Sequence, residues 1–340
     1  MQRSGTGSGV TLRRVLASVI WTTIGFLFVW YAWRLLLIAF AGLLLAVILH
    51  AFADGFQRLT HLGPKSSFAL TVVALVGLIA LAIWLIAPRA ISEGSQVVSV
   101  IPQSIAEAKR HLNQTSWGTF IVRVASRAMS STAEASRVSA FASGVTDAVG
   151  AAVVVIVVGF YAALNPGEYS GGLLRLVPEQ HRARALEVAR AVIYTLRWWL
   201  LGQLVPMTVL GIATMIGLWI LGIPLAFVLG LFTALMIFIP YLGALASAIP
   251  AILVGLQQGP TMAMYVAILY LCIHSAEGYV LTPLVQKRAV RLPPIMTILA
   301  QLLMWMITGL LGVALATPLA AVGLVIVKML YLHEDVGPNS

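Results

Sequence analysis

Residues 221–260 read LGIPLAFVLGLFTALMIFIPYLGALASAIPAILVGLQQGP, and this stretch decides the fold. It contains no charged residue, and the helix-breaking sequence IPYLG at its middle divides it into two arms of about 17 residues each. A helix needs about 20 apolar residues to cross the hydrocarbon core of a bilayer, so each arm is short for a full span. Irregular backbone at membrane depth must be lined by protein or water. The sequence therefore predicts a re-entrant helical hairpin over residues 222–260.

The composition of the whole chain points the same way. Of its 340 residues, 60% are hydrophobic and 9% are charged, which lies outside the range of soluble globular proteins. The apolar runs are long and do not alternate, so we predict an all-α polytopic membrane protein. The net charge of +10 is explained by basic cytoplasmic loops better than by nucleic acid binding. A single cysteine, Cys272, excludes an intrachain disulfide.

The first 88 residues predict a short tail followed by three transmembrane helices. Residues 1–14 are basic and rich in Ser and Gly, and residues 15–88 contain three apolar runs. Only Arg34 separates the first two runs, so we expect a tight hairpin there. Basic residues mark the cytoplasmic side of a membrane protein, which places the N-terminus inside.

The next segment, residues 89–146, is too charged to lie in lipid. Its apolar positions between Val97 and Leu112 recur every three or four residues, so they share one face of a helix. We expect an amphipathic helical arm outside the membrane, packed on the membrane surface or on a neighbouring subunit.

Residues 147–330 predict a transmembrane transport core. It includes a cytoplasmic amphipathic helix over residues 178–198, because Pro178 suits a first helical turn. Residues 293–328 are too long for one helix and are broken at TGLLG, so a second re-entrant hairpin is expected. The chain then has about six full spans and two hairpins, and a C-terminal tail, residues 331–340, that returns to the inside.

One carboxylate stands out in this core. Glu277 is the only acidic residue between positions 187 and 334. Because a charge at the bilayer centre costs about 2.5 kcal/mol or more on insertion scales, such a residue is a candidate functional group. His274 lies three residues earlier on the same face, and the pair could couple transport to a proton or cation. The alternative is a structural ion pair with Arg197 or Arg288. Two ligands are too few for a metal site.

Other candidate pathway residues are uncharged. Gln203 and Gln301 are polar groups in apolar segments, where they could line a pathway or, more commonly, form interhelical hydrogen bonds. Pro240, Tyr241 and Gly243 would expose backbone groups at the hairpin tip, although a buried tight turn needs the same residues. The sequence has no HExxH, GxSxG, GxGxxG or phosphate-loop motif, so we expect neither an enzyme nor a cofactor.

Several motifs in the second half of the chain resemble the autoinducer-2 exporter (AI-2E) family of bacterial membrane transporters. They are LRWWLLGQ (196–203), LWILGIPLAFVLGLFTALMIFIPYLGALASAIPA (218–251), EGYVLTPLVQKRAVRLPP (277–294) and LLGVALATPLAAV (310–322). The chain departs from the family pattern at Tyr279, where the motif usually reads EGN. The residues that fall on the pattern are Gln203, Pro240, Tyr241, Gly243, Pro250, Glu277, Gly278, Thr282 and Pro283.

The resemblance implies a homo-oligomeric, multi-pass permease of the bacterial inner membrane, with both termini in the cytoplasm. Its partners would be the lipid bilayer, a small polar solute such as autoinducer-2, and H⁺ or Na⁺ as a coupling ion. The residues alone leave two alternatives open: a scaffold that transports nothing, and a passive pore. Tyr279 replaces an amide beside Glu277, which makes the identity of the solute the least determined part of this expectation.

Overall fold

In the computed structural model of the chain, every regular element among the described residues is a helix. For residues 7–31 the structure describes the course of the backbone, and the side chain of Thr22 only. The predicted amphipathic arm, the C-terminal tail beyond residue 332, and Thr282, Pro283 and Arg288 lie outside the described residues. The described residues are 7–61, 63–78, 150–165, 177–281 and 292–332, with isolated positions between these ranges.

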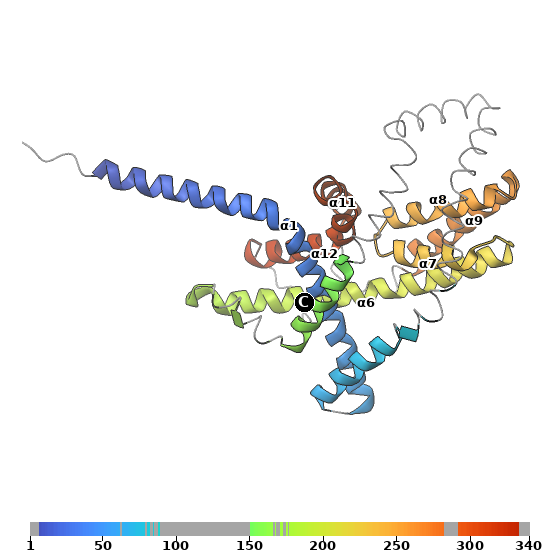
Figure 1. Ribbon diagram of the computed structural model, residues 1–340, viewed down its shortest axis with the longest axis horizontal. Helices are drawn as coiled ribbons and strands as arrows, with labels where there is room; N and C mark the ends of the chain where they lie inside the picture. Colours follow the sequence, from blue (N-terminus) through green and yellow to red (C-terminus); the bar gives the residue numbers. More distant parts are fainter. Residues whose placement is uncertain are drawn as a thin grey trace, which may run out of the picture.

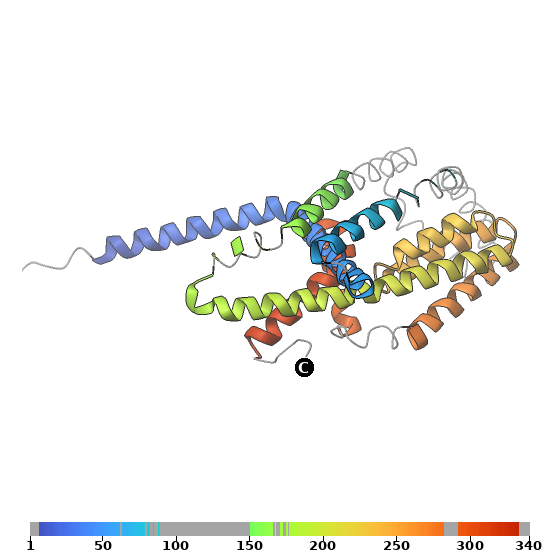
Figure 2. The same ribbon diagram turned by 90° about the horizontal axis from the view of Figure 1, so that it is seen from below.

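The long helix α6 (Arg182–Ile220) organises the molecule, after a 3-10 turn at Glu179–His181. Its buried residues recur every three or four positions from Ala191 to Leu218, so one face is covered along most of its length. Figures 1 and 2 show α1 (Gly7–Thr60) and α12 (Leu310–Leu330) beside its N-terminal half and α7 (Ala226–Met236) and α9 (Pro260–Ala276) beside its C-terminal half. Helix α8 (Leu242–Leu256) packs on α7 and α9. The predicted amphipathic helix and the span after it are thus one continuous helix, because nothing between them breaks the backbone hydrogen bonding.

Helix α1 (Gly7–Thr60) corrects the prediction for the N-terminal region. The helix continues through Arg34, so the tight hairpin expected there is wrong. A single arginine marks a polar position but favours helix, and no Gly or Pro accompanies it to break the backbone. The part of α1 from Ala32 to Thr60 is long and apolar enough to cross a membrane.

The stretch 222–260 forms the predicted helical hairpin. Helices α7 (Ala226–Met236) and α8 (Leu242–Leu256) pack against each other and are joined by a tip at residues 237–241. Helix α9 (Pro260–Ala276) follows and ends in a π-helical turn, η2 (Glu277–Leu281). That this hairpin is re-entrant in the membrane stays a prediction.

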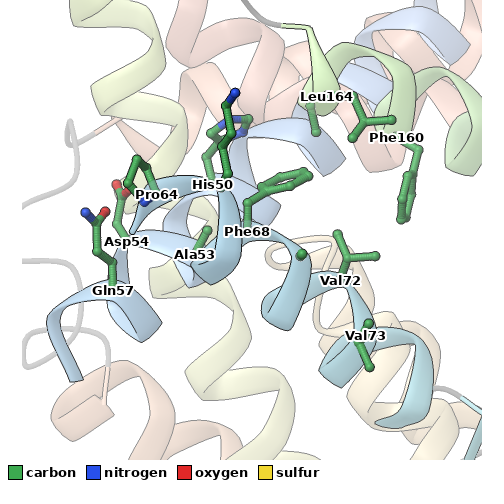
Figure 3. A pocket seen from close by; sticks show the side chains of 13 residues that line it. His50, Ala53, Asp54, Gln57, Pro64, Phe68, Val72, Val73, Phe160 and Leu164 are labelled. Atoms are coloured by element: carbon green, nitrogen blue, oxygen red, sulfur yellow. The ribbon is translucent and has the colours of Figure 1, made fainter. Parts of the chain in front are cut away.

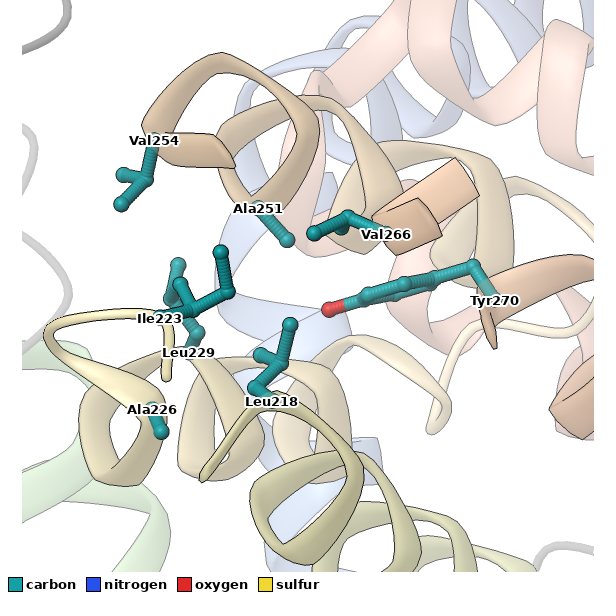
Figure 4. Packing of buried hydrophobic residues seen from close by; sticks show 8 residues of the cluster. All are labelled: Leu218, Ile223, Ala226, Leu229, Ala251, Val254, Val266 and Tyr270. Atoms are coloured by element: carbon teal, nitrogen blue, oxygen red, sulfur yellow. The ribbon is translucent and has the colours of Figure 1, made fainter. Parts of the chain in front are cut away.

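A buried apolar cluster joins this hairpin to α6 and α9, as Figure 4 shows. The approach of α6 and α7 is close because both helices carry small residues at the contact: a Cβ on Gly211 would touch Ala234, and one on Gly230 would touch Met215. The cluster therefore fixes one side of the hairpin on α6. Its members are Leu218, Ile223, Ala226, Leu229, Ala251, Val254, Val266 and Tyr270.

The second predicted break is at Gly309, where α11 (Pro294–Thr308) meets α12 (Leu310–Leu330). Gly309 has a φ of +67° and a ψ of −147°, a conformation that is essentially limited to glycine. The two helices pack against each other as a pair. Since α12 is long enough to cross a membrane and α11 is shorter, their re-entrant placement also stays a prediction.

Among the described residues, four helical segments are long and apolar enough to cross a membrane. The helices Pro64–Leu78 and Gly150–Leu164, at predicted spans, are apolar but shorter in their described part. The predicted total of about six spans is therefore untested. The four segments are Ala32–Thr60, Glu179–Ile220, Pro260–Leu281 and Leu310–Leu330.

Candidate functional site

The first part of the tip of the α7–α8 hairpin, residues 237–239, is enclosed by other helices, whereas Tyr241 at its end is 52% exposed. Ile237 and Ile239 are buried, and the ring of Phe238 packs edge-on against Trp199 of α6, with ring centres 5.7 Å apart. Phe238 also packs on a buried apolar cluster formed by α1, α6 and α12. Irregular backbone at membrane depth requires this kind of enclosure. The tip is thus held among three other helices.

Two of the predicted glutamines converge on this tip. The side-chain amide of Gln203 on α6 donates to the carbonyl of Ile237, and that of Gln301 on α11 donates to the carbonyl of Pro240 at 2.9 Å. Both side chains are buried, with 5% and 0% of their surface exposed. Gln301 Oε1 is buried as well and has no hydrogen-bond partner among the described residues. An acceptor is therefore left unsatisfied beside the tip.

The backbone of the tip is strained at Tyr241. Its φ of +63° and ψ of −58°, with Leu242 N–H donating to Pro240 O at 2.7 Å, describe a classic γ-turn, which is rare and costly. Strain of this kind costs about 1–3 kcal/mol and persists only where surrounding contacts impose it. Gly243 completes the turn, because a Cβ there would collide with the carbonyl of Met236. The two glutamines supply part of the contacts that hold this turn.

The carboxylate identified in the sequence is paired with its predicted histidine. His274 Nδ1 lies 2.9 Å from Glu277 Oε2, and both side chains are partly buried. The hydrogen bond occupies Nδ1, so the other ring nitrogen of His274, Nε2, is left to find a partner of its own. That atom is buried and has no partner among the described residues. Glu277 lies near the C-terminal end of the apolar segment Pro260–Leu281 and not at its middle.

A chain of contacts leads from this pair to the hairpin tip. The ring of His274 lies 5.9 Å from that of Tyr270, centre to centre, and the Tyr270 hydroxyl shares a hydrogen bond of 2.8 Å with the hydroxyl of Thr233 on α7. The carbonyl of Thr233 in turn accepts from the N–H of Ile237. The Glu277 pair and the tip are therefore connected through Tyr270 and one turn of α7.

The predicted partner Arg197 does not pair with Glu277. It donates instead to Asp54 of α1, so the ion pair proposed between Arg197 and Glu277 is wrong. The reason is the direction of the side chain, since Arg197 faces α1. Glu277 uses the histidine on its own helix.

The comparison with known proteins covers most of the chain. The model of the AI-2E family transporters matches residues 16–331. The chain belongs to the AI-2E transporter family. Together with its long apolar helices, this membership makes it a membrane protein.

Three relatives, all named provisionally as transport proteins, match part of this chain. YueF of Bacillus subtilis (strain 168) is 30% identical over 174 residues, or 51% of this chain and 46% of YueF. YrrI of the same strain is 30% identical over 158 residues, or 46% of this chain and 44% of YrrI. MT0215 of Mycobacterium tuberculosis (strain CDC 1551 / Oshkosh) is 33% identical over 106 residues, 31% of this chain and 29% of its own. Each match spans less than half of the relative's length.

The remaining predicted residues lie away from the tip. Pro250 is within α8, and Gly278 and Tyr279 are on the exposed side of η2, where Tyr279 is 86% exposed. Two residues at the site, Tyr270 and Thr233, were not predicted from the sequence. The spacing of Tyr270 four residues before His274 was a usable signal. The contact of Tyr270 with Thr233, 37 residues apart, depends on tertiary packing.

Proposed function

We propose that the protein is a secondary transporter whose solute binds at the tip of the α7–α8 hairpin. The observation that carries this proposal is Gln301 Oε1, a fully buried acceptor without a partner among the described residues, beside the strained turn at Tyr241. Leaving such a group unpaired costs about 1–3 kcal/mol, which a bound hydroxyl or amine could recover. Broken helices that present backbone groups to a solute are typical of transporter sites.

The pair of His274 and Glu277 is the proposed coupling group. It is close enough to share a proton, its free Nε2 can accept another, and Tyr270 and Thr233 connect it to the hairpin. Binding or release of H⁺ or Na⁺ at this pair would then change the contacts of α9 with α7. This gives the hairpin a route for responding to an ion gradient.

The family supports a more specific assignment. In this proposal the solute is small and polar, like autoinducer-2, and it is exported across the bacterial inner membrane, with both chain termini in the cytoplasm. The transporter would work as a homo-oligomer. Since Tyr279 is exposed, its departure from the EGN pattern would affect solute entry or exit more than binding at the tip.

The test is flux in proteoliposomes that contain the full chain, measured for autoinducer-2 and for Na⁺ with and without an imposed pH gradient. We expect autoinducer-2 flux that responds to the gradient, and loss of that response in Glu277→Gln. Glu179→Gln is the matched control, because Glu179 is an exposed carboxylate outside the site. Wild-type protein that moves neither probe would support the scaffold alternative, and flux that ignores the imposed pH gradient would support a passive pore.

A further inference from the structure

A second site lies away from the α7–α9 cluster. It is an open pocket of about 620 Å³ between α1 and the helices Pro64–Leu78 and Gly150–Leu164, shown in Figure 3. Ligand sites in proteins commonly measure about 300–1,000 Å³, so the pocket is large enough for part of an organic molecule. Neither the hairpin tip nor the Glu277 pair contributes to it.

The lining of this pocket is divided into a polar end and an apolar end. Gln57, Asp54 and Pro64 lie together at one end in Figure 3, and Val72, Val73 and Phe160 lie at the other. Lys65, the residue after Pro64 in the chain, also lines the pocket. Phe68 stands between the two ends in Figure 3. The division suits an amphiphile, a molecule with one polar and one apolar part.

The polar end favours an anion. Asp54 is already neutralised by its ion pair with Arg197. Lys65 is exposed, and in the described part of the chain it has no ion pair. Arg58, one helical turn beyond Asp54 on α1, adds a second exposed cation close by. The charge that faces a ligand here is therefore positive.

The direction of the pocket matches the direction of a lipid in a bilayer. Its polar end lies beside the last two turns of the candidate span Ala32–Thr60, where the apolar segment finishes and the headgroups begin. Its apolar end continues onto Val73 and Val76, which are 68% and 53% exposed on a helix that is apolar over its described length. In a membrane these side chains face hydrocarbon, so the pocket opens toward acyl chains.

We infer that this pocket is a binding site for an anionic phospholipid. The phosphate contacts Lys65, and the first part of an acyl chain lies between Phe68 and Phe160. A soluble anion would use the lysine but would leave the apolar half in contact with lipid tails. The bound lipid also borders the ion pair between Asp54 and Arg197, which connects α1 to α6.

The test measures lipid retention by native mass spectrometry of the full chain, supplied with phosphatidylglycerol or phosphatidylcholine at equal concentration. We expect about fivefold preferential retention of phosphatidylglycerol, because a lysine gains about 1 kcal/mol beside a lipid with a net negative charge and phosphatidylcholine, a zwitterion, has none. Lys65→Gln should reduce retention to the level of phosphatidylcholine. Arg190→Gln, which removes one exposed cation on α6 outside the pocket, should leave it unchanged.

A second measurement starts from the wild-type chain, so its main result does not depend on the stability of a variant. Phosphatidylglycerol with a photoreactive group on its acyl chain should label residues 68–73 or 160–164 of the wild-type chain, and Ala69→Trp should prevent this by filling the pocket. Equal retention of the two lipids, unchanged retention in Lys65→Gln, or labelling confined to other helices would each overturn the inference.

Discussion

In the α7–α8 hairpin the helices are joined through the tip at residues 237–241, whereas in the α11–α12 pair a single residue, Gly309, makes the turn. The second turn uses a glycine in a conformation natural to it. The first places a tyrosine in a strained conformation and depends on side chains from other helices. Gln301 belongs to α11, so the α11–α12 pair helps to hold the strained tip of the α7–α8 hairpin. In the proposed function, the α11–α12 pair is therefore the support and the α7–α8 hairpin is the element that binds the solute.

The largest effect is expected at Gly243, where the two arms of the strained hairpin are in closest contact. Gly243→Val puts side-chain atoms into the backbone of Met236, and we expect a loss of about 3 kcal/mol or more in unfolding free energy. Thermal unfolding in detergent, followed by tryptophan fluorescence, measures it. Gly323→Ala in α12 is the control, since a Cβ there meets no atom within 4 Å. Wild-type stability of Gly243→Val would show that the arms are not in this contact.

The turn of the supporting pair should be the next most sensitive. Gly309→Ala forces a Cβ into a conformation that is essentially limited to glycine, so we expect a loss of about 2 kcal/mol. The same unfolding assay applies. If the alanine variant is as stable as the wild type, α11 and α12 meet through a different backbone geometry.

The connection between the two hairpins is tested at Gln301. Gln301→Met keeps the length of the side chain but removes the hydrogen bond to Pro240, and we expect a loss of about 1–2 kcal/mol. Gln258→Met is the matched control: Gln258 also donates to a backbone carbonyl, that of Gly222, but in an exposed position. Its loss should stay within about 0.5 kcal/mol. Equal losses of unfolding free energy in the two variants would show that the buried hydrogen bond from Gln301 to Pro240 does not stabilise the tip.

The smallest expected effect is a gain in unfolding free energy, at Tyr241. Tyr241→Gly removes the steric strain of the γ-turn, and we expect a gain of about 1 kcal/mol, offset in part by the greater freedom of the unfolded chain. A raised unfolding temperature is the expected result. A lowered temperature would mean that the tyrosine side chain stabilises the tip more than its backbone conformation costs.

The sequence predicted the parts of this architecture that depend on local chemistry. Gly and Pro located both turns, and the three-residue spacing of His274 and Glu277 placed the two side chains together. The interruption at Arg34 was wrong because a charge in an apolar run does not break a helix. Contacts between distant segments, such as Arg197 with Asp54, could not be predicted from spacing. The γ-turn at Tyr241 could not be predicted from the sequence either, since only tertiary contacts impose it.

The central claim is that the solute binds at the tip beside Gln301. Flux of autoinducer-2 into proteoliposomes, compared among the wild type, Gln301→Met and Gln258→Met at equal amounts of folded protein, tests it most directly. The account predicts that Gln301→Met lowers flux about tenfold or more, because a buried hydrogen bond to the solute worth about 1.4 kcal/mol is lost, whereas Gln258→Met keeps wild-type flux. Folded Gln301→Met protein that transports at the wild-type rate would contradict it.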